Sequence, residues 1–162
     1  MFASRSELLA ILRPGLICAE VGVDEGYFSR EVMQCVAPKE LHLFDLRPLP
    51  EVTGATPHNG DSATEMAKMP NNYFDWIFVD GDHTILGVQR DVEAAIPKLK
   101  ALGILAFHDY ILFDHIANHS PYGVIHEVNR LCNEGWQMVA FALEEKMFCS
   151  VALQRNHGGQ QC

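Results

Sequence analysis

The stretch W-I-F-V-D-G-D-H, residues 76–83, joins a run of four apolar residues to two carboxylates and an imidazole. The apolar run predicts a strand buried on both faces of a parallel sheet. Residues 103–109, G-I-L-A-F-H-D, repeat the pattern and end in an imidazole and a carboxylate. In open α/β sheets, ligands bind outside the carboxyl ends of the strands. The sequence therefore predicts a parallel sheet with polar, reactive side chains gathered at one edge.

Apolar runs and segments of helical period alternate along the rest of the chain. Strands are expected at residues 16–23, 41–46, 53–58, 73–80, 104–109, 136–143 and 147–153. Helices are expected at residues 6–12, 26–37, 63–69, 85–101 and 122–133. This order predicts an α/β fold, a doubly wound and mostly parallel sheet with a C-terminal antiparallel hairpin. Residues 1–155 are expected to form one domain, followed by a flexible tail at residues 156–162.

The composition argues against several classes of partner. The 162 residues include 12 Lys and Arg against 21 Asp and Glu, a net charge of −9. An acidic surface repels phosphate backbones, so nucleic acid is not expected as a partner. No apolar run approaches membrane-spanning length and the N-terminus lacks a signal-peptide core, so a cytoplasmic protein without a membrane partner is expected. No cysteines show C-x-x-C spacing, and three in apolar segments are expected to be buried, reduced thiols: Cys18, Cys35 and Cys149.

The first turn, E-V-G-V-D-E-G at residues 20–26, bears on the kind of ligand. Gly22 and Gly26 give the pattern G-x-x-x-G, which lacks the second glycine of the dinucleotide-binding fingerprint. Asp24 and Glu25 add negative charge where a pyrophosphate would lie. The turn therefore disfavours NAD, FAD and nucleotide phosphates and suits a ligand that is cationic or zwitterionic here. A tight strand–helix turn without any ligand is the alternative.

Two further acids follow the next expected strands. Asp45 ends the second strand, where an acid can accept hydrogen bonds from the ribose hydroxyls of an adenosine group. A cap or surface turn is its alternative role, although no convincing helix follows it. Asp61 and Ser62 can meet an adenine amino group, cap the helix at residues 63–69, or do both.

Five motifs together resemble class I S-adenosylmethionine-dependent methyltransferases. They are E-V-G-V-D-E-G, F-D-L, G-D-S, F-V-D-G-D-H and F-H-D-Y, in that order, within a resemblance that covers residues 14–153. The branch they resemble most includes metal-dependent sugar O-methyltransferases of antibiotic pathways. The resemblance implies a Rossmann-like sheet of seven strands and S-adenosylmethionine as cofactor. It implies cofactor contacts at the methionine end, the ribose and the adenine for Glu20, Gly22, Gly26, Asp45, Asp61, Ser62 and Asp80.

The same resemblance implies an acceptor side next to the cofactor. The implied ligands of a divalent cation are Asp80, His108 and Asp109, and Asp82 matches the residue that takes the acceptor's proton in these relatives. His108 departs from their all-oxygen ligands, because imidazole is a poor ligand for Mg²⁺ but suits Mn²⁺ and other transition ions. Either the metal is a transition ion, or no metal binds and His108 is itself a base. His83 is a further candidate base.

The expected activity is methyl transfer to the hydroxyl of a small molecule, with or without metal assistance. The residues expected to be catalytic are Asp82, His83 and His108. Few residues precede the first strand, so either the acceptor is small, a second subunit completes the site as a homo-oligomer, or the chain binds cofactor without turnover. That last reading, a non-catalytic S-adenosylmethionine-binding or assembly module, is the alternative function. In the loop at residues 110–120, His115 and His119 are weaker candidates for contact with acceptor or metal.

Overall fold

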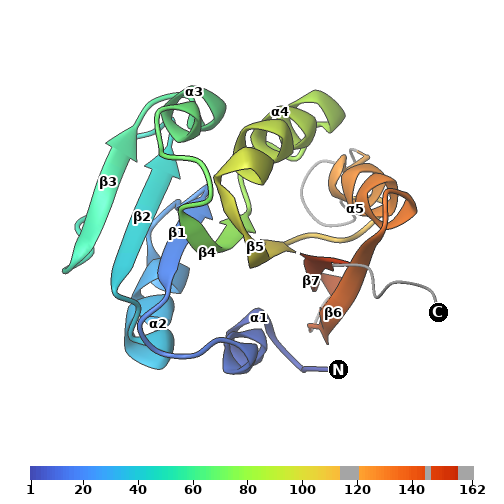
Figure 1. Ribbon diagram of the computed structural model, residues 1–162, viewed down its shortest axis with the longest axis horizontal. Coiled ribbons are helices and arrows are strands. Elements are labelled where there is room, and N and C mark those ends of the chain that lie inside the picture. Colours follow the sequence, from blue (N-terminus) through green and yellow to red (C-terminus); the bar gives the residue numbers. More distant parts are fainter. Residues whose placement is uncertain (114–120, 145–146, 157–162) are drawn as a thin grey trace.

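The computed structural model describes residues 1–113, 121–144 and 147–156. Within these ranges, seven strands form a single sheet in the order β3-β2-β1-β4-β5-β7-β6 (Figure 1). In chain order, the strands are β1 (Ile17–Val21), β2 (Glu40–Asp45), β3 (Ala55–Asn59), β4 (Phe74–Val79), β5 (Leu99–Phe107), β6 (Trp136–Leu143) and β7 (Cys149–Arg155). The helices are α1 (Arg5–Leu8), α2 (Tyr27–Val36), α3 (Ser62–Ala67), α4 (Ile85–Ala95) and α5 (Val124–Asn133), with 3₁₀ turns at Leu9–Ile11 and Ile96–Lys98.

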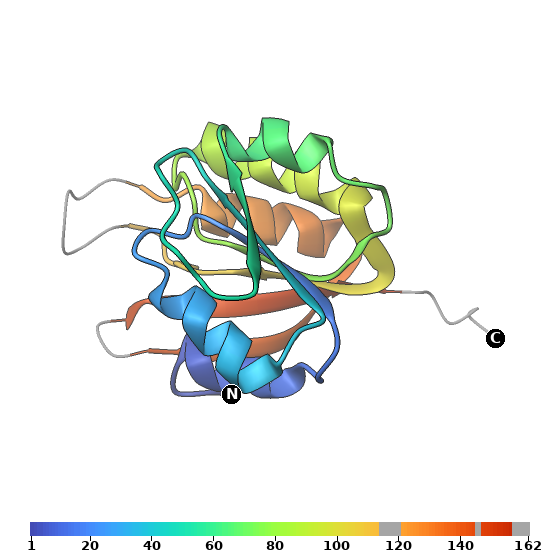
Figure 2. The ribbon, with the colours of Figure 1, turned by 90° about the vertical axis from the view of Figure 1, so that its left-hand side faces the viewer.

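The strand directions confirm the expected fold class. The first five strands pair in parallel, whereas β7 pairs antiparallel with both β5 and β6. The predicted C-terminal hairpin is present, and its second strand lies between β5 and β6. Helices α3, α4 and α5 cover one face of the sheet, and α1 and α2 cover the other (Figure 2). The fold is therefore a doubly wound, Rossmann-like sheet.

Two apolar cores, one on each face, hold the helices to the sheet. On one face, Val88 and Val92 of α4 and Val128 of α5 are buried. On the other face, Phe28 and Val32 of α2 are buried. Because helices cover both faces, the central strands are continuous apolar runs, as parallel sheets require. The two cores therefore hold the strand ends at the carboxyl edge in fixed positions.

One expected helix, residues 85–101, was predicted too long. The helix α4 ends at Ala95, a 3₁₀ turn follows, and β5 begins at Leu99. Pro97 explains the end, because proline lacks the amide hydrogen and its ring clashes with the carbonyl four residues earlier. Leu99 is buried, and it reaches the core from a strand in register with Phe74.

Three other expectations concern the burial of cysteines, membrane-spanning segments and the C-terminal tail. Cys18 and Cys149 are buried as expected, but Cys35 is exposed, because α2 turns Val32 and Val36 toward the core instead. In the described part of the chain, the helices are all too short or too polar to cross a membrane. The tail expected at residues 156–162 lies outside the described residues, except for its first residue.

Candidate functional site

The ends of the parallel strands form one line across the carboxyl edge of the sheet. Val21 of β1 is in register with Val79 of β4, which is in register with Phe107 of β5. The next residues continue the hydrogen bonding, since the Asp80 amide donates to Val21 at 2.7 Å and the His108 amide donates to Val79 at 3.1 Å. The sheet register therefore brings together the polar residues that follow these strands.

Gly22 lies where the backbone after β1 comes closest to the backbone after β4. Its φ is +83°, and a Cβ added there would lie 2.1 Å from the carbonyl oxygen of Asp80. The position therefore needs glycine both for its left-handed conformation and for space. At Gly26, φ is +72° and an added Cβ would meet the Pro50 side chain at 2.8 Å.

Asp45 is a fixed, ionised carboxylate at the end of β2. It is buried and accepts hydrogen bonds from the amides of Val23 at 2.9 Å, Asp24 at 3.2 Å and Arg47 at 2.8 Å. Burial acts to raise the pKa of Asp45, but the amide donors outweigh it and the pKa is lowered. A carboxylate has about four acceptor sites, so room remains for a further donor.

Asp61 and Ser62 begin α3, and each also has a partner on α4. The Asp61 carboxylate accepts from the Thr64 amide at 2.9 Å, and both its oxygens lie 3.1 Å from Arg90 Nη2. The predicted cap of α3 is thus confirmed for Asp61. Ser62 Oγ donates to Asp91 Oδ1 at 2.5 Å. Burial is the main cause that raises the pKa of Asp91 to about 6.

Asp91 was missed as a site residue in the sequence. It lies among the apolar residues of α4 that face the sheet, between Val88 and Val92. An acid on the apolar stripe of an amphipathic helix is the signal that could have found it, because a buried carboxylate needs a polar partner.

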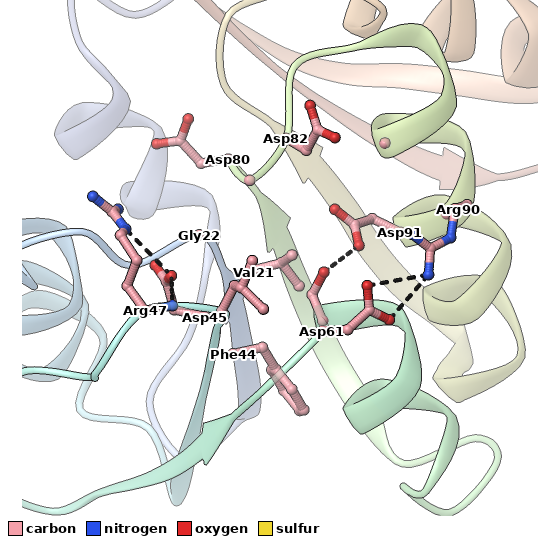
Figure 3. A pocket seen from close by; sticks show the side chains of 14 residues that line it. Val21, Gly22, Phe44, Asp45, Arg47, Asp61, Asp80, Asp82, Arg90 and Asp91 are labelled. Carbon is pink, nitrogen blue, oxygen red and sulfur yellow. Dashed lines mark hydrogen bonds and ion pairs between the residues drawn. The ribbon is translucent and has the colours of Figure 1, made fainter.

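A cavity of about 500 Å³ at the carboxyl edge of the sheet is lined by Gly22, Asp45, Asp61, Ser62 and Asp91, among others. Figure 3 shows Asp45, Asp61, Asp82 and Asp91 around it. Asp82 lies in this cavity, and its Oδ1 accepts from the Thr84 amide at 2.9 Å. Thr84 itself caps α4, so neither Asp80 nor Asp82 caps that helix.

A second cavity, of about 370 Å³, adjoins the first. Both are lined by Gly22, Arg47, Asp80 and Gly81. Glu20 lines only the second, where it is buried with 2% of its surface exposed and accepts from Ser29 Oγ at 2.6 Å. Burial is the main cause that raises the pKa of Glu20 to about 8, and the charge of Asp80 adds to it. Without a ligand, Glu20 is therefore held neutral at neutral pH.

Glu20 should make the folded state less stable as the pH rises. The folded chain keeps a proton that the unfolded chain loses near the ordinary pKa of 4.5. The stabilisation is therefore complete below about pH 4.5 and is lost as the pH rises through about 8. Urea unfolding from about pH 6 to about pH 7.5 should show the wild type losing about 2 kcal/mol more than Glu20→Gln. Parallel pH profiles for the two proteins would contradict this assignment.

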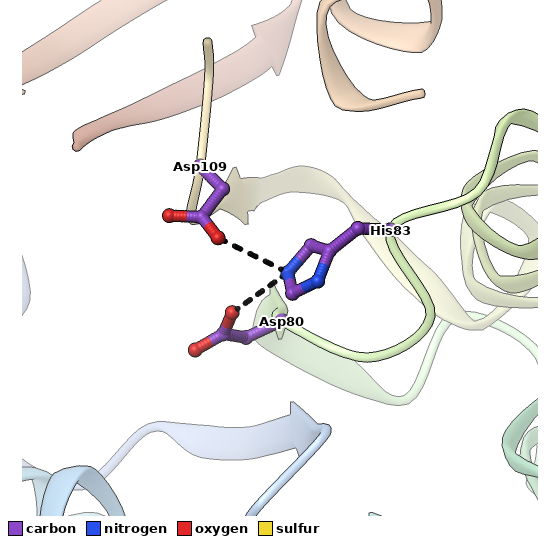
Figure 4. Close-up of side chains that lie close together, drawn as sticks. All are labelled: Asp80, His83 and Asp109. Atoms are coloured by element: carbon purple, nitrogen blue, oxygen red, sulfur yellow. Dashed lines mark hydrogen bonds and ion pairs between the residues drawn. The ribbon is translucent and has the colours of Figure 1, made fainter. Parts of the chain in front are cut away.

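Asp80, His83 and Asp109 form a compact cluster beside the second cavity (Figure 4). One ligand atom from each lies within 4.8 Å of the others, and His83 Nε2 is 3.3 Å from both carboxylates. Burial acts to lower the pKa of His83, but the two carboxylates outweigh it and the pKa is raised. Burial raises the pKa of Asp109, whose φ of +55° is uncommon outside glycine.

His108, expected as the third member of this cluster, lies beside it. Its Nε2 is 3.3 Å from Asp109 Oδ1, which is an ion-pair distance without hydrogen-bond geometry. Asp109 Oδ1 is buried and accepts no hydrogen bond from the described residues. His108 Nδ1 shares a hydrogen bond of 2.9 Å with Ser150 Oγ, which also donates to Glu144 at 3.2 Å. Two carboxylates and an imidazole at this spacing can hold a divalent cation or share a proton.

Arg5 is another residue of the site that sequence reasoning missed, and it contacts the cluster at Asp80. Its Nη1 lies 3.1 Å from Asp80 Oδ2, and its guanidinium lies over the Phe28 ring at 4.8 Å. No motif pointed to Arg5, because its partners come from separate elements of the fold: Phe28 from α2 and Asp80 from the turn after β4. His115 and His119 lie outside the described residues.

Comparisons with known proteins agree with this architecture. A family described as a methyltransferase domain matches residues 19–110, more than half of the chain. No curated protein matches the sequence.

Several solved structures share the fold. A SAM-dependent methyltransferase from Aquifex aeolicus is 15% identical over 92% of this chain and 88% of that chain, with a TM-score of 0.68. The MycE methyltransferase of the mycinamycin biosynthetic pathway, in complex with Mg, SAH and mycinamycin VI, is 15% identical over 91% of this chain and 47% of that chain, with a TM-score of 0.59. The B. subtilis tRNA methyltransferase TrmK is 13% identical over 96% of this chain and 67% of that chain, with a TM-score of 0.67.

Proposed function

The chain belongs to the methyltransferase-domain family, and from that premise we propose that it methylates a hydroxyl group of a small molecule with the help of a divalent cation. S-adenosylmethionine is the methyl donor. The observation that carries the proposal is the cluster of Asp80, His83 and Asp109 beside the two joined cavities. A cation bound there would lie where the acceptor meets the donor.

The two cavities suit the two ends of S-adenosylmethionine. The larger one offers Asp45 to the ribose hydroxyls, and it offers Asp61 and Ser62 to the adenine. The smaller one offers carboxylates to the cationic methionine end, including Asp80 and the buried Glu20. Gly22 lines both cavities, where they adjoin. This fit supports the cofactor contacts expected from the sequence, with Gly26 shaping the turn.

We assign the cation to Asp80, His83 and Asp109, with His108 as the neighbouring proton acceptor. His83 thus takes the ligand position expected for His108. The buried, otherwise unpartnered oxygen of Asp109 is the kind of group that a cation satisfies. An imidazole ligand favours Mn²⁺ or another transition ion over Mg²⁺.

The chemistry needs alignment more than covalent help from the chain. The acceptor oxygen forms a bond to the methyl carbon as the bond from that carbon to sulfur breaks, and the hydroxyl proton passes to a base. A bound cation would lower the pKa of the hydroxyl. The side chains hold donor and acceptor in line, which alone accounts for much of the rate enhancement in such reactions.

A small acceptor is supported by the charges around the site. Carboxylates line both cavities and the chain carries a net charge of −9, which disfavours a nucleic-acid acceptor. The alternative, cofactor binding without turnover, is favoured by one observation: the Arg5 guanidinium already lies at Asp80.

Manganese binding separates these two functions. Titration with Mn²⁺, followed by electron paramagnetic resonance, should show binding to the wild type and at least about tenfold weaker binding to Asp109→Asn. Asp82→Asn is the matched control, because Asp82 carries the same group two residues from Asp80 but lies outside the cluster. Its Mn²⁺ affinity should stay within about twofold of the wild type. Absence of binding to the wild type, or equal losses in both variants, would rule out the metal-assisted reading.

A further inference from the structure

We propose that Arg5 binds the carboxylate at the methionine end of the methyl donor, and that its guanidinium leaves Asp80 to do so. The inference rests on the proposed function, because it requires S-adenosylmethionine in the joined cavities. Arg5 lies on α1, outside residues 19–110 that match the family. It would be a donor-binding residue that the family motifs do not contain.

The charges of the second cavity are uneven. Four acidic side chains line it, of which Glu20 is neutral without a ligand: Glu20, Asp24, Glu25 and Asp80. Its permanently charged cations are Arg5 and Arg47. The methionine end of the donor brings an ammonium and a sulfonium, which the acids attract, and one carboxylate, which they repel. The donor's carboxylate therefore needs one of the two arginines.

Arg47 is already committed to the ribose side. Its Nη1 lies 3.0 Å from Asp24 and its Nε lies 3.5 Å from Asp45. Both partners are carboxylates of the turn after β1 and of the end of β2, and 64% of the Arg47 side chain is exposed. Moving Arg47 would leave the buried Asp45 without its ion pair, so Arg5 is the better candidate to bind the donor's carboxylate.

Arg5 has donors to spare. Among the described residues, its guanidinium contacts a single carboxylate, through Nη1 at 3.1 Å. The face of the guanidinium lies over the Phe28 ring, which also lines the cavity. A guanidinium offers five N–H groups in a planar fork, so the remaining groups can bind a second carboxylate through two hydrogen bonds.

The backbone of Arg5 is held in place by hydrogen bonds that do not involve its side chain. The Arg5 amide donates to Glu144 Oε1 at 2.8 Å, and the next residue, Ser6, donates to Glu31 at 2.6 Å. An exchange of partners therefore needs rotation of one side chain and no movement of α1. Asp80 Oδ2, the oxygen that Arg5 leaves, would then face the donor's ammonium, while Oδ1 stays at the cluster with His83.

Calorimetric titration with two ligands tests the assignment. S-adenosylhomocysteine has the amino-acid end, whereas 5′-methylthioadenosine keeps the adenosine and the thioether and lacks the amino acid. Arg5→Ala should weaken S-adenosylhomocysteine binding about tenfold or more and leave 5′-methylthioadenosine binding within about twofold. Arg5→Lys, which keeps the charge without the planar fork, should give an intermediate loss. Arg13→Ala, a change of the same charge at an exposed position outside both cavities, should alter neither ligand.

Any one of the following results would overturn the assignment. Arg5→Ala could weaken both ligands equally, weaken neither, or tighten S-adenosylhomocysteine binding; the last result would mean that Arg5 only competes for Asp80. Each of these leaves the proposed function standing, since the wild type still binds. Failure of the wild type to bind either ligand would instead reject the proposed function and this inference with it. If circular dichroism shows Arg5→Ala to be unfolded, Arg5→Lys decides, with an unchanged ratio of the two affinities counting against the role.

Discussion

Gly22→Ala should lower the free energy of unfolding by roughly 3–5 kcal/mol. Two costs combine at this position. An alanine at φ +83° is strained, and its Cβ would lie 2.1 Å from the Asp80 carbonyl oxygen. Backbone atoms cannot move aside as a side-chain end can, so the strands β1 and β4 must separate at the carboxyl edge. Urea unfolding at neutral pH, followed by circular dichroism, measures the loss.

Gly15→Ala provides a closely matched control. Gly15 has a φ of +82°, but an added Cβ there meets no atom within 4 Å. This variant should therefore show only the conformational cost, about 1 kcal/mol. Equal losses of unfolding free energy at the two glycines would contradict the close approach of the two backbones at Gly22. They would also contradict the geometry of both cavities, which Gly22 lines.

Asp45→Asn should weaken both the fold and the binding of the donor. The Asn NH₂ group would replace one of the two carboxylate oxygens, so it would face either the amide of Val23, which donates to Oδ2, or that of Arg47, which donates to Oδ1. Leaving such buried groups unsatisfied should lower the free energy of unfolding by about 2–3 kcal/mol. Loss of the ribose acceptor should weaken S-adenosylhomocysteine binding on the order of 10- to 100-fold. Unfolding in urea and calorimetry measure the two effects separately.

Asp24→Asn is the control for this variant. Asp24 pairs with the same arginine, Arg47, at 3.0 Å, but 71% of its side chain is exposed. An exposed ion pair contributes little, so stability should change by less than about 0.5 kcal/mol. A loss of unfolding free energy in Asp24→Asn as large as that in Asp45→Asn would mean that charge alone, rather than the buried hydrogen bonds, stabilises the turn.

The sheet could be predicted from sequence because its signals are local. Apolar runs such as residues 76–79 end in acids or glycines, and each run became a strand of the sheet. The antiparallel edge follows from the hairpin at the end of the chain, whereas no local signal marks the crossover after β3 that places β4 beside β1. The helix at residues 85–101 was too long because apolar periodicity continued past Pro97, where a single residue ends the helix and the next strand begins.

The candidate site was only partly predictable, and distance along the chain explains the difference. Asp45, Asp80 and Asp109 end strands or follow them within two residues, so the register of a parallel sheet places them at the same edge. The contacts of Arg5 and Ser150 depend on how the first helix and the last strand pack beside the central ones, which no motif encodes. The same holds for the position of His83, which reaches the cluster because the turn after β4 folds back toward Asp109.

The central claim is that the carboxyl edge of this sheet binds S-adenosylmethionine. Calorimetric titration of the wild type with S-adenosylhomocysteine tests it most directly, since the ligand shares the adenosine and the amino-acid end and cannot react. We predict saturable binding of one molecule per chain, weakened in Asp45→Asn and unchanged in Arg13→Ala, a variant outside both cavities. No heat of binding at a protein concentration of about 0.1 mM, with a folded protein, would contradict the claim.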